Sequence, residues 1–177
     1  MSQIKKVTSH VVSAPVEKPF TSSRGWIYKT RGSCIVEIET SDGIVGWGEC
    51  YGPAAVSKAF IDTQFGPRII GRDPFDVEVI WEDLYNRIKD YGTTGMAISA
   101  ISGIDIALWD IIGKSCGQPI HKLIGGSYRD EVTAYATGLY FIDMNRLIEE
   151  AVEEAIEFKE NGFTAIKMKI GLGDLKL

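Results

Sequence analysis

The chain has 177 residues, which is enough for one ordinary domain or two small ones with a sizeable core. Apolar residues make up 45% and charged residues 24%, close to the globular average, which argues against wholesale disorder. The net charge of −5 argues against a general nucleic-acid binder. It leaves open an anionic small-molecule substrate, because a pocket sets its own local potential.

Neither a secretory signal nor a membrane span is expected. No apolar stretch follows Lys5 and Lys6, as a secretory signal would require, and no apolar run is long enough to cross a bilayer. The cysteines Cys34, Cys50 and Cys116 are odd in number and widely spaced, which is typical of reduced thiols. We therefore expect a cytoplasmic protein without nucleic-acid or membrane partners.

Antiparallel strands are predicted in the first third of the chain. Residues 4–12 are rich in the Val, Ile and Thr that suit a pleated surface, and a loop with two prolines is expected to follow. Residues 34–40 alternate between apolar and acidic side chains. Ser41-Asp42-Gly43 predicts a tight turn, and residues 44–50 return as the partner strand. One face of this meander needs cover.

Three helices are predicted to supply that cover, over residues 54–64, 75–91 and 96–114. Asp73-Pro74 indicates the start of the second, with Asp as N-cap and Pro at the first helical position. Its apolar stripe comprises Val77, Ile80, Trp81, Leu84 and Ile88. The third is expected to stop near Gly117, because Gly and Pro end helices.

The pattern changes after Gly125-Gly126. Residues 132–140 are predicted to form a strand, residues 145–160 a helix, and residues 163–170 a second strand. Strand, helix and strand in that order predict a βαβ unit with parallel strands. We place the domain boundary between residues 128 and 129.

Two lysines stand out on the last predicted strand. Lys167 and Lys169 share one face, because successive side chains of a strand point to opposite faces. At the C-terminal end of a buried barrel strand, mutual repulsion and desolvation would lower the pKa of each lysine and favour a general base. The spacing alone equally fits a surface strand with two solvated lysines.

Several motifs together resemble the mandelate racemase and muconate lactonizing enzyme branch of the enolase superfamily. The resemblance covers essentially the whole chain, in the family's order and spacing. The motifs are Asp42-Gly43-x-x-Gly46-Trp47-Gly48-Glu49, Ile104 to Asp110, Gly113-Lys114, Gly117-Gln118-Pro119, Leu123 to Gly126, and Lys167-x-Lys169. The segment from Ile104 to Asp110 follows a core stripe, so we interpret it as structural rather than catalytic.

The resemblance implies a fold and a chemistry. The fold is an α+β capping domain at residues 1–128, a meander plus helices, followed at residues 129–177 by the first βαβ of a truncated (β/α) TIM-like barrel. The chemistry is abstraction of the proton α to a carboxylate, with Lys169 as general base and Lys167 tuning that base or contacting the substrate. Trp26 and Tyr51, in loops that resemble the family's capping loops, are the expected substrate contacts.

The resemblance also implies Mg²⁺ as the cofactor of the complete enzyme. The family's metal ligands come from later barrel strands, so they are absent from this chain, and no metal site is expected in it. A complete barrel takes about 250 residues, so the 177 residues are expected to be catalytically incomplete. The complete protein is expected to be a homo-oligomer that binds a small carboxylate substrate.

Alternatives stay open at this point. The resemblance favours an acid-sugar dehydratase, a lyase, and leaves a racemase, epimerase or cycloisomerase of the same branch as the alternative. A non-catalytic capping-domain protein is the rival from another class. Gly171-x-Gly173 after a strand hints at a nucleotide-binding turn, but the third glycine of that motif is missing.

Overall fold

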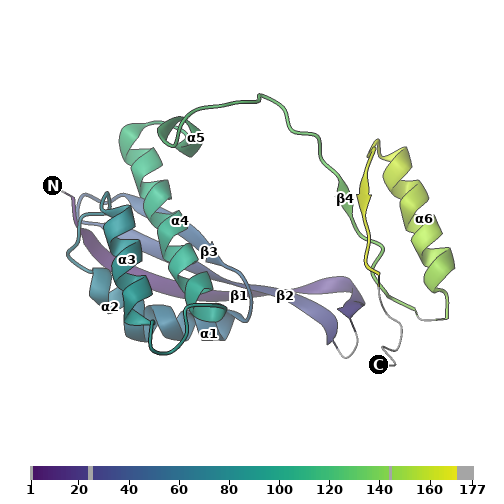
Figure 1. Ribbon diagram of the computed structural model, residues 1–177, viewed down its shortest axis with the longest axis horizontal. Helices are drawn as coiled ribbons and strands as arrows, with labels where there is room; N and C mark the ends of the chain where they lie inside the picture. The colour runs from purple at the N-terminus through teal and green to yellow at the C-terminus, as the bar shows by residue number, and fades with distance from the viewer. Residues whose placement is uncertain (1, 24–25, 144, 171–177) are drawn as a thin grey trace. The chain divides into compact units, whose positions relative to one another are not determined.

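The computed structural model describes residues 2–23, 26–143 and 145–170. The chain divides into two compact units, each described here by itself. The first unit combines Met1–Ser13 with Gly32–Tyr128, and the second combines Ala14–Arg31 with Arg129–Leu177 (Figure 1).

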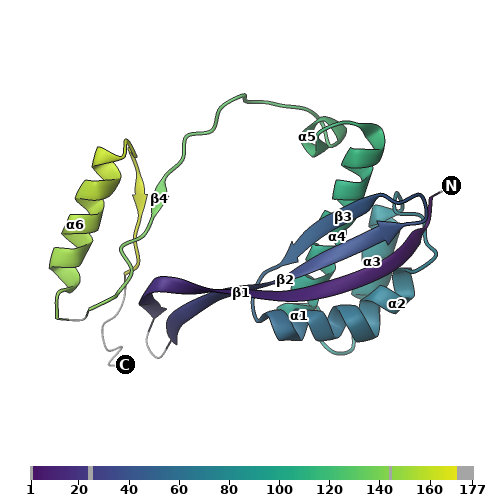
Figure 2. The same ribbon diagram turned by 180° about the vertical axis from the view of Figure 1, so that it is seen from behind.

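A three-stranded sheet in the order β1-β2-β3 forms one layer of the first unit (Figure 2). Its strands are β1 (Ile4–Ser23), β2 (Trp26–Thr40) and β3 (Val45–Cys50), and β2 and β3 are antiparallel with Cys34 opposite Cys50. The loop expected after residue 12 is wrong, because β1 continues to Ser23. Its prolines are tolerated because β1 is an edge strand and can do without some ladder N–H groups.

The predicted alternation along β2 is confirmed. Cys34, Val36 and Ile38 are fully buried, whereas Glu37 and Glu39 stay partly exposed on the other face. The buried face packs against the helices and forms a continuous apolar core with Phe65, Leu84 and Leu108 among its members.

Helical turns run without a break through the segment predicted as the first helix. They comprise α1 (Ala54–Phe60), the π-helix η1 (Ile61–Phe65) and α2 (Gly66–Ile69). The π turn inserts one extra residue per turn, which lets both Ile61 and Phe65 point into the core.

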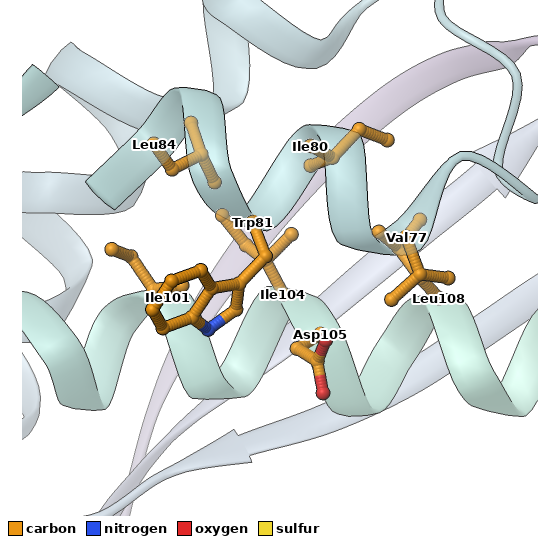
Figure 3. Close-up of a pocket in the computed structure, with 8 residues that line it drawn as sticks. All are labelled: Val77, Ile80, Trp81, Leu84, Ile101, Ile104, Asp105 and Leu108. Atoms are coloured by element: carbon orange, nitrogen blue, oxygen red, sulfur yellow. The ribbon is translucent and has the colours of Figure 1, made fainter. Parts of the chain in front are cut away.

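The next two helices, α3 (Val77–Arg87) and α4 (Met96–Cys116), pack against each other through aliphatic side chains (Figure 3). The prediction that Asp73 caps the first of them is wrong. Asp73 instead accepts a hydrogen bond of 2.9 Å from the N–H of Phe75 in a turn that precedes the helix. α4 ends as predicted, with Gly117 in the left-handed conformation at φ 60°.

Glycine allows α4 to approach β3 very closely. A Cβ atom on Gly48 would lie 1.9 Å from the carbonyl oxygen of Gly103, and one on Gly46 would lie 2.2 Å from that of Ala107. No larger residue fits without moving the backbone. The glycines of the Gly46-Trp47-Gly48 motif are therefore packing residues.

α4 also covers the free edge of β3. The carboxylate of Asp110 accepts a 2.9 Å hydrogen bond from the N–H of Trp47, and Lys114 Nζ donates to the carbonyl of Val45 at 2.7 Å. The two side chains pair with each other at 2.6 Å. These bonds satisfy main-chain groups that an edge strand otherwise leaves open to pairing with another chain.

Among the described residues, α4 is the one helix long and apolar enough to cross a bilayer by length and composition. Its most apolar stretch is 56% buried inside the structure. A core helix can have this length and composition as well. A short helix, α5 (Ile120–Leu123), follows it.

The second unit contains the predicted βαβ unit in shortened form. Its strands β4 (Ala136–Thr137) and β5 (Ile166–Lys167) are parallel, and α6 (Leu147–Glu160) connects them. The apolar face of α6 is not buried, since no residue of α6 is fully buried and Ile148 is 75% exposed. The pair of strands in this unit offers too little surface to cover the helix.

Candidate active site

The parallel pairing of β4 and β5 places the two lysines. Ala136 N–H donates to the carbonyl of Ala165 at 3.0 Å, and Gly138 N–H donates to that of Lys167 at 3.2 Å. The ladder therefore ends at Lys167, and Lys169 follows directly beyond it. Both lysines lie where β5 ends, beside the segment that leaves β4.

Each lysine ammonium lies over the ring of a tyrosine that flanks β4, Tyr135 just before the strand and Tyr140 beyond its end. Lys167 Nζ is 5.9 Å from the centroid of Tyr135, and Lys169 Nζ is 5.5 Å from the centroid of Tyr140. At these distances the negative face of an aromatic ring attracts a cation. The two tyrosines therefore hold the lysine side chains beside β4.

The sequence left open whether the two lysines are buried or solvated, and in the part of the chain that the structure describes neither is fully buried. Lys167 is exposed and Lys169 is half-buried. Barrel strands bury their inner face only when neighbouring strands close around it, and here β5 pairs with β4 alone.

The backbone just after β4 is tightly constrained. Leu139 is the one non-glycine residue with positive φ, 55°, among those described, and its N–H donates to Glu154 Oε2 at 2.8 Å. A Cβ on Gly138 would lie 2.5 Å from Glu154 Oε1 and 2.6 Å from the Phe158 ring, so a larger residue there would have to displace these two side chains of α6. The contacts with α6 thus fix a sharp bend in the backbone just before Tyr140. Backbone strain of this kind is frequent at functional sites.

Residues of the β1–β2 hairpin join the same cluster within the second unit. The ring of Phe20 lies 4.5 Å from that of Tyr140, and Thr21 and Phe141 exchange main-chain hydrogen bonds of 2.9 and 3.0 Å. Arg31 lies over the rings of Phe20 and Tyr28, at 5.3 and 4.9 Å. A continuous series of contacts therefore links the hairpin to Lys169.

Sequence reasoning missed Tyr135, Tyr140, Leu139 and Arg31. The available signal was the position of Tyr140 at the end of the first strand of a predicted βαβ unit, where barrel sites gather. The left-handed conformation of Leu139 had no signal, because leucine gives no local reason for a positive φ.

The other predicted contacts, Tyr51 and Trp26, stay predictions. Tyr51 belongs to the first unit, and its side chain is 84% exposed. Trp26 opens β2, and its side chain lies outside the described part, as do Gly171 and Gly173 of the alternative nucleotide-binding turn.

A metal site of the family type does not fit these residues. In the described part of the chain, no group of three or more His, Cys, Asp or Glu side chains is arranged to hold a metal ion. The lysine cluster offers ammonium groups and rings, whereas Mg²⁺ requires oxygen ligands.

Comparisons with known proteins agree with the fold. A family model described as "Mandelate racemase / muconate lactonizing enzyme, N-terminal domain" matches residues 6–125. D-galactarolactone cycloisomerase of Agrobacterium fabrum is 43% identical over 171 residues, which are 97% of this chain and 45% of that protein. Arabinonate dehydratase of Saccharolobus solfataricus is 42% identical over 137 residues, 76% of this chain and 36% of that protein.

A solved structure matches over nearly the whole chain. The crystal structure of L-talarate/galactarate dehydratase from Salmonella typhimurium, liganded with Mg and L-lyxarohydroxamate, is 29% identical with a TM-score of 0.83. The match covers 98% of this chain and 45% of that one. The chain thus spans less than half the length of each of these relatives. The chain belongs to the mandelate racemase and muconate lactonizing enzyme branch of the enolase superfamily, and it carries the N-terminal capping-domain fold of that family.

Proposed function

We propose that the complete protein removes the proton α to the carboxylate of an acid sugar, with Lys169 as the general base. The observation that carries the proposal is the pair of lysines at the end of β5 in a chain of this family. Lys169 is the better candidate for the base, because it is the less exposed of the two and contacts the Tyr140 ring.

Each group of the cluster has a proposed part in that step. Lys169 is proposed to accept the α proton, and Lys167 is proposed to assist it as its neighbour on the chain. Alternatively, Lys167 contacts the substrate carboxylate directly. Trp26 and Tyr51 are proposed to contact the substrate from the capping domain.

Other segments of the complete protein would have to supply the remaining parts of the site. We propose that residues 1–128 form the capping domain and that residues 129–177 begin a (β/α) barrel. Mg²⁺ is the proposed cofactor, since a dehydratase with this fold is liganded with Mg. We further propose a cytoplasmic homo-oligomer without nucleic-acid or membrane partners.

The relatives support two overall reactions that share the first step. One relative of 42% identity is named a dehydratase and one of 43% identity a cycloisomerase. A dehydratase eliminates water after the α proton is lost, whereas a cycloisomerase opens or closes a ring. We propose the dehydratase as the first candidate. The cycloisomerase is the second candidate, because its match extends over 97% of this chain.

The decisive experiment uses the full-length protein that contains these residues. It is incubated in D₂O with Mg²⁺ and a panel of acid sugars and their lactones, and the α position is followed by NMR. Exchange with loss of water supports the dehydratase, and exchange with ring opening or closure supports the cycloisomerase. Exchange in mandelate-like acids alone would sink the acid-sugar proposal. If the full-length protein has a mass near 19.5 kDa, that of this chain, a non-catalytic capping protein is favoured instead.

A further inference from the structure

An open groove of about 670 Å³ runs between α3 and α4 on the first unit. α3 contributes Trp81 and Tyr85, and α4 contributes Asp105 and Trp109. The two residues of each pair are one helical turn apart. Glu78 and Glu82 also line it. These six residues define what we call the acidic groove, and nothing in the lysine cluster of the second unit belongs to it.

Asp105 is the unusual member of the acidic groove. Its carboxylate emerges beside the aliphatic seam between the helices, close to Trp81 (Figure 3). It is half-buried, and burial raises the pKa of its carboxyl with no hydrogen bond or neighbouring charge contributing. Among the described residues it has no hydrogen-bond or ion-pair partner. A carboxylate that lies beside apolar side chains and has no protein partner gains from pairing with a cation.

The charges of the groove indicate what that partner is. The groove is lined by three carboxylates and one ammonium group. The carboxylates belong to Glu78, Glu82 and Asp105, and the ammonium group belongs to Lys89. Arg68 and Arg72 are not available to neutralise them, because both pair with Asp83. The groove therefore favours a cation.

The aromatic residues narrow the choice of cation. Trp81 and Tyr85 stack at 5.0 Å with their planes 12° apart, and Trp81 is 39% exposed. A guanidinium group stacks on aromatic faces and pairs with a carboxylate in a two-pronged fashion, which an ammonium cannot do. A metal ion would gain nothing from these rings.

We propose that the acidic groove binds an arginine side chain carried by a polypeptide partner. The guanidinium stacks on Trp81 and pairs with Asp105. The groove is far larger than one guanidinium group, and it is open along its length, so the backbone and neighbouring side chains of a peptide fill the rest. The inference is independent of the function proposed for the lysine cluster.

The test uses the 177-residue chain and three short acetylated peptide amides that differ only at a central arginine, lysine or citrulline. Citrulline keeps the shape of arginine and lacks its charge. Binding is followed by the NMR indole N–H resonances of Trp81 and Trp109. We expect saturable shifts with the arginine peptide and at least about tenfold weaker binding of the citrulline and lysine peptides.

Variants locate the site. Asp105→Asn, which keeps the shape of the side chain, is expected to lower the affinity for the arginine peptide to that of the citrulline peptide. Glu82→Gln is expected to weaken binding less, since Glu82 is exposed. Glu157→Gln removes one charge on α6 in the second unit and serves as the matched control, with unchanged binding expected. Equal affinity for arginine and citrulline, full affinity of Asp105→Asn, or no shift at either indole would each overturn the proposal.

Discussion

Lys169 Nζ lies 5.5 Å from the centre of the Tyr140 ring, and that ring lies 4.5 Å from the ring of Phe20. The proposed base is thus joined by side-chain contacts to the β1–β2 hairpin. Tyr140 is held in turn by the bend at Leu139, whose N–H is bonded to Glu154 of α6. Four segments that are distant in sequence therefore define the surroundings of one amine.

The first prediction concerns that amine. In the full-length protein, Lys169→Ala should lower the rate of α-proton exchange by about 10²–10⁴-fold, the usual contribution of a general base. Folding should be retained, because Lys169 lies at the end of β5 and is not a member of the apolar core. The rate is measured by NMR in D₂O. The exposed Lys122 of α5 provides the control, and Lys122→Ala should exchange at the parent rate. Undiminished exchange in Lys169→Ala would refute the assignment.

The second prediction concerns the close approach of β3 and α4. Gly48→Ala should reduce the free energy of unfolding by about 1–3 kcal/mol or prevent folding, as overpacking of a core does. Its new Cβ would otherwise lie 1.9 Å from the carbonyl oxygen of Gly103. Gly32→Ala, where the nearest atom lies at 3.3 Å, should cost much less. Urea unfolding of both variants distinguishes them, and equal midpoints would contradict the packing argument.

The third prediction concerns the edge of β3. Asp110→Ala leaves the N–H of Trp47 without its 2.9 Å partner and Lys114 without its ion pair. We expect a loss of about 1–2 kcal/mol in the free energy of unfolding, as for other removed hydrogen-bond partners. Hydrogen exchange of the Trp47 amide should accelerate more than that of Gly48, which faces Val36 of β2. Unchanged protection at Trp47 would show that Asp110 is not its cap.

The fourth prediction is a pH dependence at Asp105. Burial raises the pKa of this carboxyl in the folded chain, so folding favours its protonated form. Its contribution is therefore fully present below the unfolded pKa of about 3.9 and is lost as the pH rises through the raised folded value. At pH 7 the charged Asp105 destabilises the fold, so Asp105→Asn should be more stable than the parent, by a margin that the partial exposure of Asp105 to solvent keeps small.

At pH 3 the advantage of Asp105→Asn should vanish, because the parent carboxyl is then protonated. Thermal unfolding at the two pH values measures the effect, with Glu157→Gln as the control for loss of one charge. A variant that is less stable than the parent at pH 7 would mean that Asp105 has a stabilising partner after all.

The fifth prediction concerns thiol reactivity. Cys34 and Cys50 are fully buried, and burial raises the pKa of the Cys50 thiol to about 12. Only the thiolate reacts with alkylating agents, so both should resist iodoacetamide in the folded chain at pH 8. Cys116 is exposed and should react fully. Mass spectrometry should show one label in the native chain and three after denaturation, and early labelling of Cys50 would contradict the buried pair.

Local rules predicted much of the first unit. The buried face of β2 follows from side-chain alternation at Cys34, Val36 and Ile38, and the end of α4 follows from Gly117. Both depend on neighbours in the chain. The motifs likewise predicted the family, since the family model matches residues 6–125.

Tertiary structure decided the rest, because it depends on groups far apart in the chain. The exposure of Lys167 and of the apolar face of α6 depends on which strands close over them, not on periodicity. The glycines before and after Trp47 were predicted as strand residues, and only the structure shows how closely α4 packs on them. Asp105 sits in a core-like stripe by sequence, and only the crossing of α3 and α4 leaves its carboxyl half-buried beside Trp81 without a partner. At these positions burial and pairing depend on which distant elements pack together, and the local pattern does not contain that information.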